Sequence, residues 1–171
     1  MLRKTGLTAA AAAAAIVMTA SGTALAADMA VAALADRDGK NVGTVTLRQT
    51  PHGALLHAKL VNLPAGAHAF HVHAVGKCEP PFKSAAGHYN PDGKKHGLMS
   101  EDGPHAGDMP NIHVPASGAL EIEVHAPGVN LDGQLFDNDG AAIVIHEGAD
   151  DYKTDPAGAA GPRIACGVIK K

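Results

Sequence analysis

Residues 66–73 read Gly-Ala-His68-Ala-Phe70-His71-Val72-His73, and their alternation predicts a β-strand over residues 67–74. Residues two apart on a strand point to the same face, so His71 and His73 project together, while Phe70 and Val72 face the other side. The two Cα atoms then lie about 6–7 Å apart, close enough for both imidazoles to share one ion. His68 has the opposite parity, and we interpret it as a hydrogen-bonded structural histidine.

The same alternation recurs along the chain and predicts half-buried antiparallel strands. The apolar stretch 29–35 ends at Asp36-Arg-Asp-Gly39, which is a hairpin signal. Further strands are expected around residues 44–48, 56–60, 120–124, 141–145 and 163–169. With about eight strands and no long helix in the mature chain, the pattern predicts an all-β fold, an eight-stranded antiparallel Greek-key β-sandwich or barrel with two long functional loops.

The longer of these loops runs from residue 76 to residue 115 and has no sustained periodicity. So long an irregular segment in a compact domain is normally either functional or disordered. The spacing His88-x7-His96-x8-His105-x2-Asp108 indicates a loop folded around an ion. Three imidazoles and one carboxylate form a closed tetrahedral set, which is typical of structural zinc. The second loop, residues 152–162, is rich in Gly, Pro and Ala.

The N-terminus has the composition of a secretory signal peptide. Arg3 and Lys4 precede an apolar segment over residues 7–18, and Ala24-Leu-Ala26 supplies a small-residue cleavage pattern. We expect residues 1–26 to be cleaved and residues 27–171 to form one exported, periplasmic domain without a stable membrane anchor. The alternative is an uncleaved anchor, which the uncharged segment 5–27 is long enough to form.

Charge and cysteine usage restrict the class of partner and the compartment. The formal net charge is −3, whereas nucleic-acid binding requires a basic surface. Cys78 and Cys166 form an even pair far apart in an exported chain, which favours a disulfide. Free buried thiols or thiolate ligands are the alternatives. A disulfide across this separation would stabilise the fold by roughly 4–5 kcal/mol in the chain-entropy model.

Motifs over essentially the whole mature chain resemble the copper/zinc superoxide dismutase family. The matching segments are Gly66-x-His-Ala-Phe-His-Val-His73, Gly87-His-Tyr-Asn-Pro91, Lys95-His-Gly97, His105-x-Gly-Asp108, Val144-Ile-His-Glu147, Ala149-Asp-Asp151 and Gly161-Pro-Arg-Ile-Ala-Cys-Gly-Val-Ile169. Their order and spacing agree with the family, and the Cys78–His88 interval resembles that of its exported bacterial branch.

The resemblance implies a role for each matching residue. Copper would be held by His71, His73, His88 and His146, and zinc by His88, His96, His105 and Asp108. Asp150 would link His71 to His96, Arg163 would hold the superoxide anion beside copper, and His88 would carry one of the protons consumed. The resemblance also implies the Cys78–Cys166 disulfide. An all-imidazole copper site agrees with one-electron chemistry, because imidazole suits copper in both oxidation states.

Other assignments are weaker. A copper or zinc buffer would need the ligands but not Arg163, and a zinc hydrolase would need an HExxH helix or a nucleophile elbow, which the sequence lacks. The intact zinc set argues against a copper-only relative. We expect surface positions for His52, His57, His113 and His125, although an additional metal site among them is left open. Lys153 is a candidate for steering superoxide, and a homodimer is possible.

Overall fold

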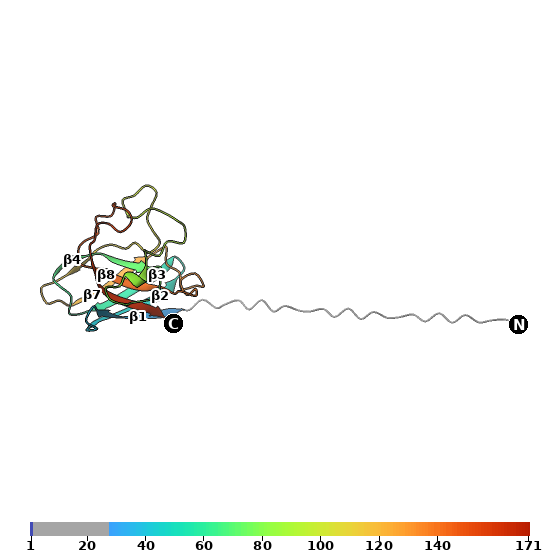
Figure 1. The fold of residues 1–171 in the computed structure, drawn as a ribbon, viewed down its shortest axis with the longest axis horizontal. Coiled ribbons are helices and arrows are strands. Elements are labelled where there is room, and N and C mark those ends of the chain that lie inside the picture. Colours follow the sequence, from blue (N-terminus) through green and yellow to red (C-terminus); the bar gives the residue numbers. More distant parts are fainter. Residues whose placement is uncertain (2–27) are drawn as a thin grey trace.

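The computed structural model describes Met1 and residues 28–171, so the predicted signal peptide lies outside the described part of the chain apart from Met1. In residues 28–171, nine strands and one 3-10 turn form the domain (Figure 1). Their bounds are β1 Met29–Asp36, β2 Asn41–Thr50, β3 Gly53–Leu60, β4 Gly66–His68, β5 Phe70–His73, η1 Lys83–Ala85, β6 Ile112–Val114, β7 Leu120–Ala126, β8 Ala142–His146 and β9 Arg163–Lys170.

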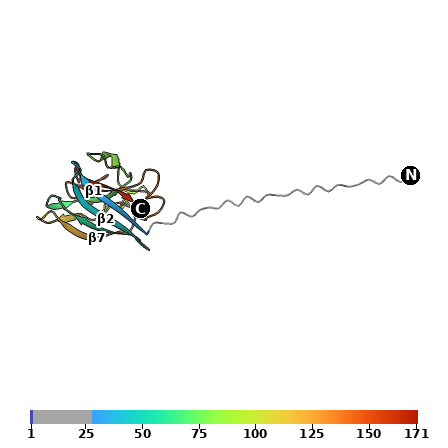
Figure 2. The same cartoon turned by 90° about the horizontal axis from the view of Figure 1, so that it is seen from below.

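Seven strands form one curled antiparallel sheet in the order β5-β8-β9-β1-β2-β3-β7 (Figures 1 and 2). The strands β1, β2, β3 and β7 lie side by side, whereas the chain crosses over to place β5 against β8 at the other edge. The predicted all-β Greek-key fold is therefore confirmed. In residues 28–171 no helix is long and apolar enough to cross a membrane.

Two details differ from the sequence prediction. The strand expected over residues 67–74 is divided at Ala69, whose N–H donates to the Gly148 carbonyl and whose carbonyl accepts from the His146 N–H. The preceding part, β4, pairs instead with β6. Strand β6 lies inside the loop expected to be irregular up to residue 115, because three residues are too few to show a period.

The main core lies inside the curled sheet. Alternate side chains of the first three strands are buried there, including Leu34, Leu47 and Leu56, together with Phe70 of β5. Strand β8 is buried at all five positions. A second, smaller apolar cluster on its other side contains Phe82, Ala85, Ala142, Val144 and Cys166. Strand β8 is thus covered on both faces, which agrees with its continuous apolar sequence.

The two long loops pack on each other above the sheet (Figure 1). The Met99 N–H donates to the Tyr152 carbonyl over 3.1 Å. Gly97 permits this approach, since a Cβ there would lie 2.0 Å from the Tyr152 carbonyl oxygen and its φ is +108°. Cys78 and Cys166 form the predicted disulfide, with Cα atoms 5.6 Å apart, so the first loop is tied to β9.

Candidate metal centre

The first candidate group contains His71, His73, His88 and His146, which come from three parts of the chain. Strand β5 carries His71 and His73, and its pairing with β8 brings the end of β8, His146, beside them. An isolated bridge between His73 and His88 attaches the loop residue to the same place. All four residues are buried, and one ring nitrogen of each lies within 4.8 Å of the others.

The tautomers of these histidines follow from their neighbours. His71 Nε2 donates to Asp150 over 2.8 Å, His73 Nδ1 donates to the Ala86 carbonyl over 3.0 Å, and His146 Nδ1 lies 3.2 Å from the Gly161 carbonyl. Because these acceptors cannot donate, the opposite nitrogen of each ring presents a lone pair. Among the described residues, the buried ring nitrogens without a hydrogen-bond partner are His71 Nδ1, His73 Nε2, His88 Nε2 and His146 Nε2.

Convergent, buried lone pairs without donors are unfavourable in a protein interior unless a cation lies between them. Burial lowers the pKa of His71 to about 4 and that of His146 to about 3, and it holds the pKa of His73 well below its usual value. These three rings are therefore neutral at pH 7, the state in which imidazole binds a metal. The donor set fits one soft or borderline ion with nitrogen ligands.

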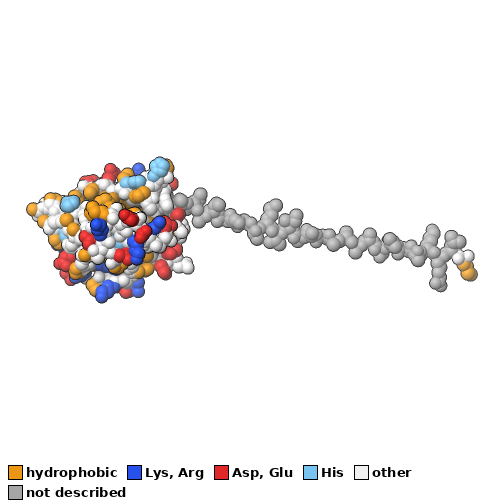
Figure 3. Space-filling view, turned by 90° about the horizontal axis from the view of Figure 1, so that it is seen from above, with side chains coloured by type: hydrophobic (Ala, Val, Ile, Leu, Met, Phe, Trp, Pro, Cys, Tyr) orange, Lys and Arg blue, Asp and Glu red, His pale blue; other side chains and the backbone are white. Residues whose placement is uncertain are grey.

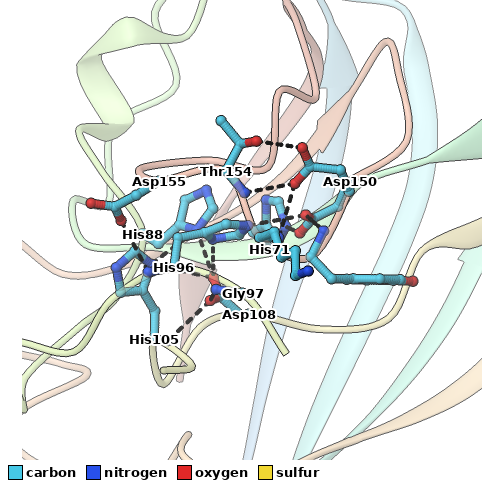
Figure 4. A network of polar contacts seen from close by, with 12 residues as sticks. His71, His88, His96, Gly97, His105, Asp108, Asp150, Thr154 and Asp155 are labelled. Atoms are coloured by element: carbon cyan, nitrogen blue, oxygen red, sulfur yellow. Dashed lines mark hydrogen bonds and ion pairs between the residues drawn. The ribbon is translucent and has the colours of Figure 1, made fainter. Parts of the chain in front are cut away.

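The second candidate group contains His88, His96, His105 and Asp108, all buried (Figure 4). Asp108 Oδ1 lies 2.7 Å from His88 Nδ1, 3.1 Å from His96 Nδ1 and 3.4 Å from His105 Nδ1. The other ring nitrogen of His96, Nε2, donates a hydrogen bond to Asp150. The Nδ1 lone pair of His96 therefore faces the carboxylate oxygen Oδ1 of Asp108. Since two acceptors repel at this distance, the geometry favours a cation between them. A three-nitrogen, one-oxygen set is typical of zinc.

Asp108 is held as a carboxylate by the loop around it. Its Oδ2 accepts the N–H groups of Gly97 and His105, each over 2.9 Å, which leaves Oδ1 directed at the three imidazoles. Burial alone would raise the pKa of Asp108, but the hydrogen bonds from His88 and Gly97 lower it to about 2. The ligand oxygen is thus ionised and oriented at neutral pH.

Asp150 joins the two groups (Figure 4). Its Oδ2 accepts from His71 Nε2 over 2.8 Å, and its Oδ1 accepts from His96 Nε2 over 3.0 Å. Although burial opposes ionisation, the hydrogen bonds from both histidines lower the pKa of Asp150. One carboxylate therefore selects the tautomer of one histidine in each group, as partners behind metal ligands commonly do.

Sequence reasoning missed Asn111, which fixes the backbone of Asp150. The Asn111 Oδ1 accepts the Asp150 N–H over 2.8 Å, and its Nδ2 donates to the Asp150 carbonyl over 2.9 Å. The Asn111 N–H also donates to the Tyr152 hydroxyl. Asn111 belongs to no periodic pattern, and its position three residues after Asp108 was the only available signal.

Arg163 begins β9 and turns its guanidinium toward the first loop. Its Nη1 donates to the Phe82 carbonyl over 2.6 Å and its Nη2 to the Ala86 carbonyl over 2.5 Å. The Ala86 carbonyl also accepts from His73 Nδ1. The positive charge of Arg163 is thus linked to the first group through the Ala86 carbonyl, which accepts hydrogen bonds from both Arg163 and His73.

The remaining histidines belong to neither group. His68 is buried and its two ring nitrogens lie 2.9 Å from the carbonyls of Pro64 and His146, in agreement with a structural role. His57 pairs with Glu121, and His125 donates to the carbonyl of His52. His52, His113 and His125 are exposed and His57 is half-buried.

Comparison with known proteins agrees with this geometry. The model of the family described as copper/zinc superoxide dismutase (SODC) matches residues 41–169. The chain belongs to the copper/zinc superoxide dismutase family. A copper/zinc superoxide dismutase of Aquifex aeolicus is 52% identical over 143 residues, covering 80% of this chain and 85% of the relative. A second, from Caulobacter vibrioides, is 46% identical over 140 residues, covering 78% and 80%.

A solved structure shows the same fold. The superoxide dismutase-like protein of Bacillus subtilis is 38% identical, with a TM-score of 0.78 over 81% of this chain and 96% of that protein. The family assignment makes this chain an oxidoreductase that dismutes superoxide and uses copper and zinc as cofactors. The two candidate groups supply donor sets that suit these two ions.

Proposed function

We propose that copper is held by His71, His73, His88 and His146, and zinc by His88, His96, His105 and Asp108, with His88 shared. The observation that carries the copper assignment is the set of four buried ring nitrogens, one per residue, that have no hydrogen-bond partner within residues 28–171. The mixed oxygen and nitrogen set around Asp108 supports zinc in the second group. His88 can serve both because its two nitrogens face different groups.

When bound, copper supplies one-electron exchange, oxidising one superoxide to oxygen and reducing a second, which becomes hydrogen peroxide with two protons. The side chains of the protein bind the substrate, deliver a proton and orient the ligands. Arg163 binds the anionic substrate, and its position is set by the carbonyls of Phe82 and Ala86. His88 Nε2 holds and delivers one of the two protons, while its Nδ1 stays directed at Asp108. Asp150 orients one histidine of each group through its hydrogen bonds to His71 and His96.

The zinc group has a structural role in this proposal. All its ligands are buried, and four ligands leave no open position. Its part is to hold His88 at a constant angle between the two groups. The orientation of His71 and His73 depends less on zinc, because the pairing of β5 with β8 positions their backbone.

A pair of ligand variants tests the assignment. His146→Ala should remove copper and leave most of the zinc, and His105→Ala should do the reverse. Metal content is measured on purified protein loaded with both ions, together with superoxide dismutation. Loss of zinc in the first variant, or of copper in the second, would contradict the division of ligands.

We also propose that residues 1–26 are removed on export and that residues 27–171 act in the periplasm, where superoxide would otherwise reach the cell envelope. The Cys78–Cys166 disulfide supports an oxidising compartment. N-terminal sequencing of protein from a periplasmic extract tests both points. A mature protein that starts at Met1 and stays with the membrane would favour the anchor instead. A homodimer remains a prediction that sedimentation tests.

A further inference from the structure

A hollow of about 490 Å³ opens beside the second candidate group. Two residues of that group, His105 and Asp108, line it, whereas none of His71, His73 and His146 does. Its other lining residues come from three segments of the chain, within residues 92–98, 103–110 and 125–128. The hollow therefore reaches the proposed zinc ligands and not the residues proposed for copper alone.

His105 is the residue of the second group whose side chain is most exposed. The exposed fraction of its side chain is 8%, against 1% for His88 and Asp108 and 0% for His96. In Figure 4, His105 lies at the end of the polar network away from His71. Because His105 also lines the hollow, the group comes closest to solvent on that side.

The second loop closes the group on the side of His96. The Asp155 carboxylate accepts the His96 N–H over 3.0 Å, and Asp150 accepts from His96 Nε2 over 3.0 Å. At Gly158 a Cβ atom would lie 2.8 Å from His96 Nε2, so no side chain fits between this backbone and the ring. A cation that approached from this side would have to break these contacts, because the loop packs directly on the ring.

Three charged side chains line the hollow, two acidic and one basic. Asp92 and Lys94 are exposed, and Asp108 is buried. Within residues 28–171 neither Asp92 nor Lys94 forms an ion pair. Acidic and basic side chains are intermixed on the face of the molecule that Figure 3 shows, so neither sign dominates there. Attraction of a cation into the hollow therefore depends on these nearby charges.

We propose that zinc enters and leaves the second group through this hollow, past His105. The inference rests on the proposed assignment of zinc to that group. Asp92 attracts the approaching cation, and Lys94 opposes it. The second loop stays packed on His96 while zinc exchanges, so the contacts that orient the first group are not broken.

A steric block in the hollow tests the path. The two native cysteines are joined in a disulfide, so His125→Cys introduces the only free thiol. His125 is exposed and lines the hollow, and the variant is labelled with a bulky aromatic maleimide. The matched control is Lys153→Cys with the same label, at an exposed position of the second loop that does not line the hollow.

Two rates are measured for each labelled protein by absorbance. The first is the release of zinc from the copper- and zinc-loaded enzyme to a coloured chelator. The second is the uptake of Co²⁺ by the zinc-free enzyme with its copper kept reduced, because tetrahedral cobalt gives a visible spectrum and Cu(I) does not. Neither measurement depends on the dismutation activity.

We expect the label at position 125 to slow uptake and release by the same factor, about tenfold or more, because an obstacle raises the barrier in both directions. The dissociation constant, which is the ratio of the two rates, should then stay unchanged. The label at position 153 should change neither rate by more than about twofold. Greater slowing at position 153, or none at position 125, would overturn the proposal. Slower uptake with unchanged release would also overturn it, because that result indicates a distorted site.

Substitutions of the exposed charges should have opposite effects. Asp92→Asn should slow Co²⁺ uptake and Lys94→Gln should speed it, each about threefold at about 10 mM salt, as one unit charge about 10 Å from a divalent cation would. Both effects should vanish near 1 M salt, where the screening length is about 3 Å. Lys153→Gln is the control and should leave uptake nearly unchanged. Effects of the same sign for the first two variants would contradict the path.

His105→Ala separates the path from the assignment of the ligands. The metal content of this variant is measured on purified protein. One zinc and one copper per chain in His105→Ala would refute the proposed zinc ligands. Loss of zinc from His105→Ala, together with normal rates in the labelled His125→Cys protein, would refute only the path.

Discussion

Asp150→Asn should weaken zinc binding more than copper binding. The carboxylate accepts one N–H from His71 and one from His96, whereas an amide offers only one oxygen. One of the two histidines then faces an NH2 group, and its ring must change tautomer or rotate. His71 lies on β5, where pairing with β8 holds its backbone, but His96 lies in a loop. His96, rather than His71, should therefore change its tautomer or rotate in the variant.

The magnitude follows from similar partners behind metal ligands, whose loss typically costs 10–100-fold in metal affinity. We expect a loss of this size for zinc, about 1.4–2.8 kcal/mol, and less than a tenfold loss for copper. Chelator competition measures both dissociation constants, and the visible spectrum of a cobalt-substituted protein reports whether the tetrahedral site persists. Asp151→Asn is the control, since Asp151 is exposed and binds only the turn at Lys153 and Thr154. A copper loss larger than the zinc loss would refute the reasoning.

Four further predictions concern stability and the loops. Cys78→Ala combined with Cys166→Ala should lower the free energy of unfolding by roughly 4–5 kcal/mol in the chain-entropy model, measured by urea denaturation against the oxidised parent. Phe70→Ala should cost about 3–5 kcal/mol in the same assay, because Phe70 is fully buried in the main core. Removing both metals should lower the melting temperature measured by calorimetry, because a metal bound only to the folded protein stabilises it. An unchanged melting temperature would contradict the proposal that the four unpartnered ring nitrogens bind a metal. Asn111→Ala should weaken zinc in the same direction as Asp150→Asn, with Asn111→Asp restoring less than full affinity because it lacks the Nδ2 donor.

Much of the fold could be predicted because strand signals are local. The alternation in β2, β3 and β7 specifies which side chains face the core, and the continuous apolar run of β8 indicates burial on both faces. The division of the predicted strand into β4 and β5 and the presence of β6 could not be predicted, because three residues show no period. Their pairing depends on the path of the chain between them.

The candidate ligands could also be predicted, because histidine spacing and family resemblance are both properties of the order of residues along the chain. Their environment could not. The unpartnered nitrogens, the shared carbonyl of Ala86 and the clamp by Asn111 each depend on contacts between residues far apart in sequence.

By itself the sequence determined the class of fold, the pair of strand histidines His71 and His73, and the residue types able to bind two metals, because each is a local or compositional property. Only the tertiary structure decided which ring nitrogen of each proposed copper ligand is left without a hydrogen-bond partner, and that Asn111 holds the backbone of Asp150. Those properties depend on distances between segments, and such distances are set when β5, β8, β9 and the two loops pack together.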